Sequence, residues 1–133
     1  MNIPVHPGKA VAGDGPANLV IDGVIGYSLQ GTPTGTAGKL IRWANAQNSL
    51  VLSLDAPSGV DTTTGTVFVP AVKATATMTL ALPKEGLHAP DVKSHVGELY
   101  LADISVPPAL YAGATLEFAV GHLFAGSDIL RLH

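Results

Sequence analysis

The chain has 133 residues and a formal net charge of −3 at pH 7; 47% of the residues are hydrophobic and 13% are charged. This length suits one domain with a single core. The absence of a lysine and arginine cluster argues against nucleic acid as a partner, and the absence of cysteine excludes disulfides and thiolate chemistry.

The first half of the chain reads as an irregular lead-in followed by a strand–helix–strand unit. Residues 1–17 are rich in proline and glycine and are expected to be irregular. The pattern predicts a strand over 18–24 and a helix running to residue 47, with Thr36 as its N-cap. Leu50–Leu54 is almost continuously apolar, which is typical of a parallel strand covered on both faces.

The second half predicts further strands and one short helix, so that 18–133 forms a single α/β domain. Alternating threonine and apolar residues favour a strand within 74–82. The other predicted elements are a short strand or extended segment at 67–72, a strand at 98–104, a helix beginning near residue 107 and an extended tail at 128–132. No apolar run approaches the roughly 20 residues of a membrane span. No secretory signal is evident either, so a cytoplasmic location is expected.

Two carboxylates follow the predicted parallel strands and are the strongest candidates for a functional site. Asp22 and Asp55 each stand at a strand end, and each leads into a turn that contains glycine. Ligands of open α/β sheets bind outside the carboxyl ends of strands. Each aspartate could instead be a turn former that bonds nearby backbone N–H groups, and the same alternative applies to Ser58 and Asp61. Two aspartates on neighbouring strands favour the site.

Other motifs are weaker. The stretch around Gly38 and Lys39 lacks the first glycine and the Ser/Thr of a P-loop, since Pro33 and Leu40 occupy those positions. Ser58 lacks the glycine two residues earlier that a nucleophile elbow requires. Lys84 follows a predicted strand and could reach a phosphate or simply be solvated. The histidines show no metal-ligand spacing.

Four ordered motifs resemble those of the YjeF N-terminal domain family, the NAD(P)HX epimerases, over about residues 18–132. The stretch 22–31 resembles the family's Asp-Ala-hydrophobic-Phe-Gly-x-Gly/Ser-x-x-Gly motif, and 53–61 resembles its Ser-x-Asp-x-Pro-Ser-Gly-x-Asp motif. Segments 79–87 and 96–107 continue the resemblance in the expected order. The resemblance implies a three-layer, Rossmann-like, mostly parallel sheet.

The resemblance also implies an isomerase. Family members interconvert the R and S epimers of NADHX and NADPHX, the hydrates of reduced nicotinamide cofactors, as a step of metabolite repair. Asp55 would act at the reacting hydrate, and Asp22 and Ser58 would be potassium ligands. The substrate would lie along the loop that carries Gly26, Tyr27, Ser28, Leu29, Gln30, Gly31 and Thr32.

The resemblance departs from the family upstream of the first strand. Family domains carry a longer upstream segment, including an asparagine loop that contributes to the potassium site, whereas only residues 1–17 precede the strand here. The sheet is therefore expected to be truncated at its N-terminal side, with 18–24 as an exposed edge strand. Such edges invite pairing, so a homo-oligomer or a complementing polypeptide is expected. The alternative to an epimerase is a non-catalytic nucleotide-binding or assembly module of the same fold.

Overall fold

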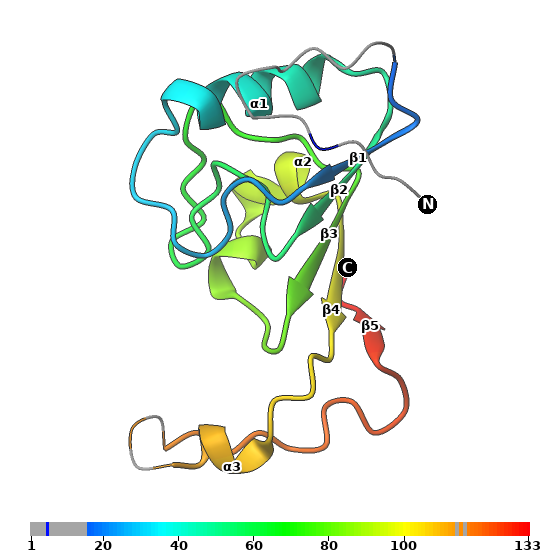
Figure 1. The fold of residues 1–133 in the computed structure, drawn as a ribbon. Coiled ribbons are helices and arrows are strands. Elements are labelled where there is room, and N and C mark those ends of the chain that lie inside the picture. Colours follow the sequence, from blue (N-terminus) through cyan, green and yellow to red (C-terminus); the bar gives the residue numbers. More distant parts are fainter. Residues whose placement is uncertain (1–4, 6–15, 114, 116) are drawn as a thin grey trace.

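The protein folds around one five-stranded sheet. The computed structural model describes residues 5, 16–113, 115 and 117–133 (Figure 1), so most of the predicted lead-in lies outside the described residues. The strands lie in chain order across the sheet; β1 to β4 are parallel and β5 is antiparallel to β4. They are β1 (Leu19–Asp22), β2 (Leu50–Leu54), β3 (Ala76–Leu80), β4 (Glu98–Ala102) and β5 (Ile129–Arg131). The predicted α/β class with a mostly parallel sheet is confirmed.

Helix α1 (Gly35–Ala46) is the longest of the described helices, and it begins earlier than predicted. Its N-cap is Thr34, because the first helical hydrogen bond runs from the Gly38 amide to the Thr34 carbonyl. The prediction of Thr36 as N-cap is therefore wrong, and Thr36 lies in the first turn.

The remaining helical segments are short. They are the 3₁₀ turns η1 (Glu85–His88) and η2 (Pro90–Val92) and the helices α2 (Lys93–Val96) and α3 (Pro108–Tyr111). Only α3 was predicted. The segment 67–72 forms no strand of the sheet and contributes a single antiparallel bridge, between Val60 and Val67.

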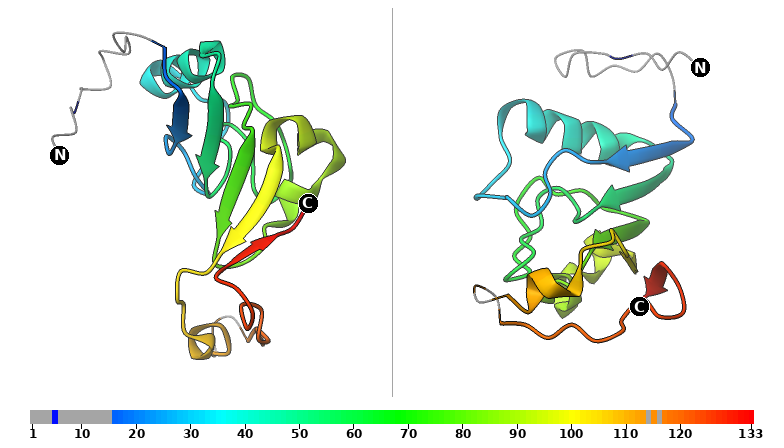
Figure 2. Two further views of the ribbon diagram at one scale, coloured as in Figure 1. Left: turned by 90° about the vertical axis from the view of Figure 1, so that its right-hand side faces the viewer. Right: turned by 60° about the horizontal axis from the view of Figure 1, so that its bottom comes forward.

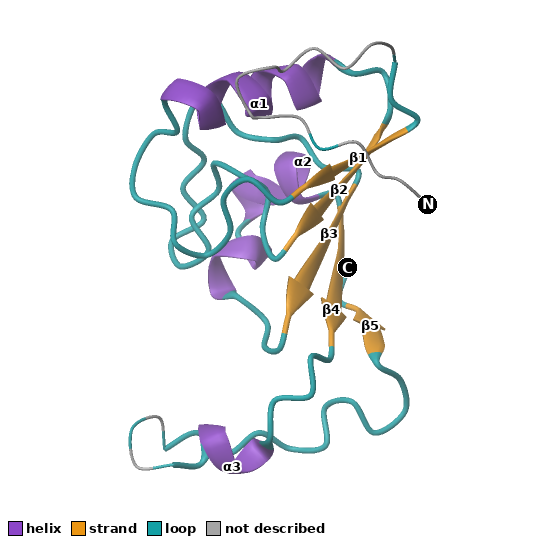
Figure 3. Cartoon of the chain, viewed as in Figure 1, coloured by secondary structure: helices purple, strands orange, loops and turns teal. Residues whose placement is uncertain are grey.

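Both hydrophobic clusters of the described core lie on one face of the sheet. Because side chains alternate between the two faces along a strand, the register puts Val20, Val51, Thr77 and Leu99 on the same face. Ile41 and Ala44 of α1 pack against the β1 and β2 side chains there. The segment 85–96 packs against the β4 side chain, and α1 and α2 accordingly lie on the same side of the sheet in Figure 3.

The opposite face is not covered by any described helix. The prediction that β2 is covered on both faces is wrong, since Leu50 is 61% exposed and Leu54 is 40% exposed. The strand order explains this, because right-handed crossovers that all step in one direction across a sheet place their helices on one face. The three-layer arrangement implied by the resemblance is thus represented in the described residues by two layers (Figure 2).

β1 is the outer strand of the sheet that the described residues form, as the sequence predicted. No helix among residues 16–113 and 117–133 has the length and apolar character needed to span a membrane.

Candidate functional site

The two predicted carboxylates meet at one edge of the sheet. β1 and β2 are adjacent and parallel, and Asp22 at the end of β1 pairs in register with Ser53 of β2. Asp55 follows the last residue of β2. Both aspartates therefore stand at the carboxyl ends of neighbouring strands, where α/β proteins bind ligands.

Asp22 is buried in a network of hydrogen bonds, with only 2% of its surface exposed. Its Oδ2 accepts hydrogen bonds from the Ser53 hydroxyl and the Ser58 amide, both at 2.8 Å. Its Oδ1 accepts one from the Ser58 hydroxyl at 2.6 Å and a longer one from the Val24 amide at 3.3 Å. The Ser58 hydroxyl oxygen also accepts a hydrogen bond from the Ile25 amide at 2.8 Å. Asp22 thus fastens the end of β1 to the segment that follows β2.

Asp61 is a turn former, whereas Asp22 combines one local bond, from the Val24 amide, with bonds from Ser53 and Ser58. Its Oδ1 accepts hydrogen bonds from the Thr63 and Thr64 amides, both at 2.8 Å. These bonds lower the pKa of the Asp61 carboxyl below 3.8, because they stabilise its ionised form. The turn interpretation, considered for every aspartate of the motif, therefore holds for Asp61.

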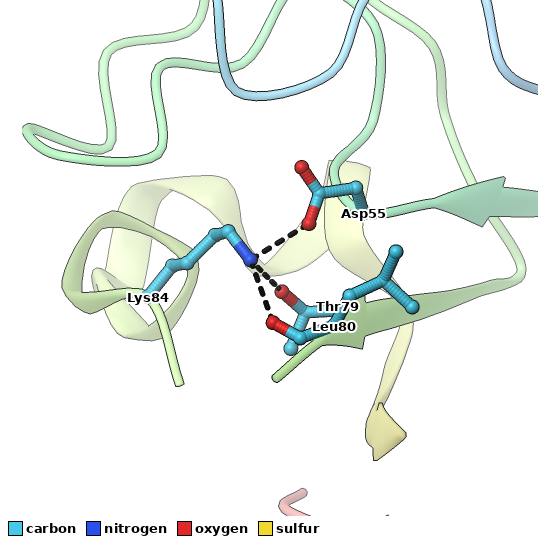
Figure 4. A network of polar contacts seen from close by, with 4 residues as sticks. All are labelled: Asp55, Thr79, Leu80 and Lys84. Carbon is cyan, nitrogen blue, oxygen red and sulfur yellow. Dashed lines mark hydrogen bonds and ion pairs between the residues drawn. The ribbon is translucent and has the colours of Figure 1, made fainter. Parts of the chain in front are cut away.

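Asp55 is held by Lys84 rather than by its own turn. The Lys84 ammonium nitrogen lies 2.7 Å from Asp55 Oδ1, and it also donates to Thr79 Oγ1 at 2.9 Å and to the Leu80 carbonyl at 3.2 Å (Figure 4). The Asp55 side chain is 23% exposed. Its backbone has a φ of 70°, a left-handed conformation that aspartate and asparagine tolerate better than most residues. Lys84 occupies one carboxylate oxygen and leaves the other for a further partner.

The predicted substrate loop passes over that second oxygen. A Cβ atom added at Gly26 would lie 3.2 Å from Asp55 Oδ2, so the bare backbone of Gly26 lies against the carboxylate. Tyr27, 73% exposed, and Lys84 both line a cavity of about 670 Å³. The structure thus brings Gly26, Tyr27, Asp55 and Lys84 together. Apart from half-buried Leu29, the rest of the predicted loop, Ser28 to Thr32, is exposed.

A family model matches the larger part of the chain. Residues 1–86, well over half of the chain, match the family described as YjeF-related protein N-terminus. The chain belongs to this family.

Relatives in the YjeF-related family are longer than this chain. An NAD(P)H-hydrate epimerase of Dehalogenimonas lykanthroporepellens is 46% identical over 114 residues, which are 82% of this chain and 45% of the relative. The bifunctional NAD(P)H-hydrate repair enzyme Nnr of Moorella thermoacetica is 38% identical over 96 residues, 72% of this chain and 18% of the relative. The chain therefore spans less than half the length of these curated relatives.

A solved structure supports the fold. The crystal structure of yeast ynu0 superposes with a TM-score of 0.64 at 18% sequence identity, covering 86% of this chain and 46% of the yeast chain. At this identity the likeness establishes the fold alone.

The sequence did not reveal several residues that lie at this edge of the sheet. Ser53 is a partner of Asp22, and its signal was a lone hydroxyl within the apolar run of β2. Thr62, Thr63 and Tyr111 line the cavity beside Lys84. Nothing in the local sequence links Tyr111 to this edge of the sheet, because its position depends on the path of the chain after β4.

The oxygen atoms of Asp22 and Ser58 are of the kind that bind an alkali cation. Asp22 and Ser58 present carboxylate and hydroxyl oxygens within 2.6 Å of each other, and hard cations prefer oxygen ligands. Within the described part of the chain, no group of three or more His, Cys, Asp or Glu side chains gathers where a metal ion could be held. A cation at this point would compete with the hydrogen bond that Ser58 donates to Asp22.

Proposed function

We propose that this chain carries the proton-transfer residues of an NAD(P)H-hydrate epimerase. This isomerase interconverts the R and S epimers of NADHX and NADPHX. The observation that carries the proposal is the Asp55 carboxylate, fixed through one oxygen by Lys84 and facing the Gly26 backbone with the other. The epimerase relatives of the same family support the assignment of the substrate.

Asp55 would carry the proton in the reaction. In the proposed step, a proton passes from the Asp55–Lys84 pair to the hydroxyl of the hydrate, the C–O bond breaks, and water leaves. Water then adds to the opposite face of the ring and returns a proton to the pair, so no atoms or electrons are gained or lost. Positioned carboxyl groups perform such transfers, and Lys84 is the nearest proton donor to Asp55.

The loop 26–32 would lie along the dinucleotide. Glycine at position 26 supports this role, because a side chain there would crowd the Asp55 carboxylate. The neighbouring cavity of about 670 Å³ lies within the 300–1,000 Å³ range of small-molecule sites, and Tyr27 at its rim offers a ring for stacking. Leu29, Gln30, Gly31 and Thr32 would provide further contacts to the substrate.

Asp22 and Ser58 would hold a potassium ion. A bound cation would supply fixed positive charge beside the reacting hydrate, and the oxygen donors of these two residues support the assignment. The buried network would then serve both the fold and the ion.

A non-catalytic nucleotide-binding or assembly module is the second candidate. The observation that favours it is the Asp22 network, in which both carboxylate oxygens already accept hydrogen bonds from Ser53 and Ser58, as in a structural role. We propose a cytoplasmic location and association through the exposed edge of β1, either with a second copy or with a complementing polypeptide.

The rate of interconversion of R- and S-NADPHX tests the proposal. The purified chain would be assayed in potassium and in sodium against the spontaneous background, beside the Asp55→Asn variant. Asp61→Asn is the matched control, because Asp61 serves a turn. An excess over background that Asp55→Asn abolishes and Asp61→Asn retains supports the epimerase, and dependence on potassium supports the ion site. A wild-type rate equal to background contradicts self-sufficient catalysis and favours the second candidate.

A further inference from the structure

Two threonines of β3 point into the core, although apolar residues fill most of the space around them. Thr77 and Thr79 are two positions apart in the strand, so their side chains lie on the same face of the sheet. Both have an exposed fraction of 0%. A buried hydroxyl costs free energy unless it forms hydrogen bonds. The partners of these two hydroxyls therefore indicate why threonine, and not valine, occupies each position.

The Thr77 hydroxyl serves the fold. It donates a hydrogen bond to the Val96 carbonyl at 2.7 Å and so fastens β3 to the end of helix α2. Thr75, just before the strand, has a similar role, because its Oγ1 accepts a hydrogen bond from the Val51 amide of β2 at 3.1 Å. Both bonds join one part of the backbone to another.

The Thr79 hydroxyl instead binds a charged side chain at the candidate site. Its oxygen accepts a hydrogen bond from Lys84 Nζ at 2.9 Å, and the same nitrogen lies 3.2 Å from the Leu80 carbonyl and 2.7 Å from Asp55 Oδ1 (Figure 4). An ammonium group has three N–H bonds, which these three acceptors occupy. In this position Lys84 has no N–H left for a substrate phosphate, and its charge is directed at Asp55.

Thr79 is the acceptor that can set the direction of the ammonium group. Lys84 reaches the site on a flexible four-carbon stem, and its side chain is 19% exposed, so its position depends on what binds the nitrogen. The Leu80 carbonyl belongs to the backbone, and Asp55 is the group that is approached. The Thr79 hydroxyl is fixed in the core, and a hydrogen bond from a charged donor is stronger than one between neutral groups.

We propose that Thr79 is a positioning residue of the epimerase site, whose hydroxyl directs the Lys84 ammonium group to the Asp55 carboxylate. The inference rests on the proposed function, because it concerns the same proton-transfer pair. Without the hydroxyl, Lys84 gains rotamers that point to solvent, and the pair forms for a smaller fraction of the time. Thr79 acts on the reaction through Lys84 and does not contact the substrate.

Three substitutions in β3 test this inference. Thr79→Val replaces the hydroxyl by a methyl group of similar size, and Thr79→Ser keeps the hydroxyl and removes the methyl group. The matched control is Thr77→Val, because Thr77 lies in the same strand with the same burial and its hydroxyl binds the backbone. Circular dichroism verifies that each variant is folded.

The first readout is the rate of interconversion of R- and S-NADPHX in potassium. We expect Thr79→Val to lower kcat by about tenfold or more and to leave KM within about twofold, since misplacing a reacting group affects the chemical step. Thr79→Ser should restore kcat to within about threefold of wild type, and Thr77→Val should leave it within about twofold. An equal loss of kcat in the two valine variants, or no loss in Thr79→Val, would overturn the inference.

The second readout needs no substrate. In ¹H–¹⁵N spectra of lysine ammonium groups, the Lys84 signal is identified by its disappearance in Lys84→Met. We expect wild type, Thr79→Ser and Thr77→Val to show this signal, because the three protons are held in hydrogen bonds, and Thr79→Val to lose it through faster exchange with water. A signal that is absent from wild type or unchanged in Thr79→Val would overturn the inference.

The two readouts separate this inference from the proposed function. A wild-type rate equal to the spontaneous background contradicts the proposed function, and the ammonium signal then decides by itself whether Thr79 directs Lys84. A wild-type rate above background that Thr79→Val retains contradicts the inference and leaves the proposed function standing.

Discussion

Asp22 and Asp55 stand at the same edge of the sheet but in opposite surroundings. Asp22 is 2% exposed, and both of its oxygens are occupied by donors from elsewhere in the chain. The Asp55 side chain is 23% exposed, with one oxygen on Lys84 and the other facing a loop. Two aspartates that look alike in sequence therefore have different exposure and different hydrogen-bond partners in the structure.

The difference shows how a fold can combine stability with chemistry. A buried carboxylate whose hydrogen bonds are complete resists change, because removing it leaves several donors without an acceptor. A partly exposed carboxylate with one oxygen outside its ion pair can exchange a proton with a substrate. Asp22 thus fastens the end of β1 to the segment after β2, whereas Asp55 has one oxygen on Lys84 and the other beside the Gly26 backbone.

Replacing Asp22 should have the largest effect on stability. Asp22→Ala leaves the Ser53 hydroxyl and the Ser58 amide buried without an acceptor, while the Ser58 hydroxyl can still donate to the Ile25 carbonyl. This change should lower the free energy of unfolding by about 3 kcal/mol. Chemical denaturation measures the change. Ser53→Ala, which removes one donor from the same network, should cost about 1 kcal/mol. Equal stability of the two variants would mean that the hydrogen bonds to Asp22 do not stabilise the fold.

Substitutions at Asp55 should separate backbone strain from the loss of the carboxylate. The left-handed φ of 70° favours asparagine and glycine over alanine, because a Cβ without a local hydrogen-bonding group is strained there. Asp55→Asn should therefore be more stable than Asp55→Ala by roughly 1 kcal/mol, although both lose the ion pair. Thermal unfolding of the two proteins compares them directly, and a more stable alanine variant would contradict the assigned conformation.

The Asp55–Lys84 pair should show a smaller coupling. Double-mutant analysis of Asp55→Asn and Lys84→Met should give an interaction energy of about 0.5–1 kcal/mol, because both side chains are partly exposed. The denaturation midpoints of the four proteins supply the value. Strict additivity would mean that Lys84 binds Thr79 and Leu80 without positioning Asp55.

The pH dependence of stability near neutrality should come from outside this edge of the sheet. Burial, with the nearby charge of Lys73, lowers the pKa of His95 below 6.5. The unfolded chain therefore takes up a proton before the folded one does. Stability should fall as the pH drops through 6.5 toward the folded pKa of His95. His95→Gln should reduce this slope in melting curves recorded across that range, and the rest should come from His133, whose pKa is also lowered by burial and by nearby His88 and Lys93. An unchanged slope would mean that His95 does not contribute.

The sequence predicted the parts of the fold that rest on continuous patterns. The apolar run of β2 has the observed bounds, and the strand–helix–strand order set Asp22 and Asp55 at one edge. The sequence did not reveal that the other face of β2 is exposed, because an apolar run does not indicate whether a layer of helices covers it. The short helical turns within 85–96 were not predicted, because each is too short to show the periodic spacing of apolar residues that marks a helix.

The contacts of the site were harder to foresee. Lys84 lies 29 positions after Asp55 (84 − 55), and its approach depends on the turn that follows β3. Sequence alone left it between a phosphate ligand and a solvated side chain. Ser53 begins the 53–61 motif but was given no role, because a hydroxyl inside a strand often satisfies only the backbone. The structure shows that it donates to Asp22 on the neighbouring strand.

An NMR titration of the ¹⁵N-labelled chain with NADPH, used in place of the hydrate, tests the location of the site most directly. We predict that the amide shifts will gather in the loop 25–32, at Asp55 and around Lys84. Shifts confined to His122, Leu123 and Phe124 of the neighbouring cavity of about 420 Å³, or no shifts at millimolar NADPH, would contradict a dinucleotide site at Asp55.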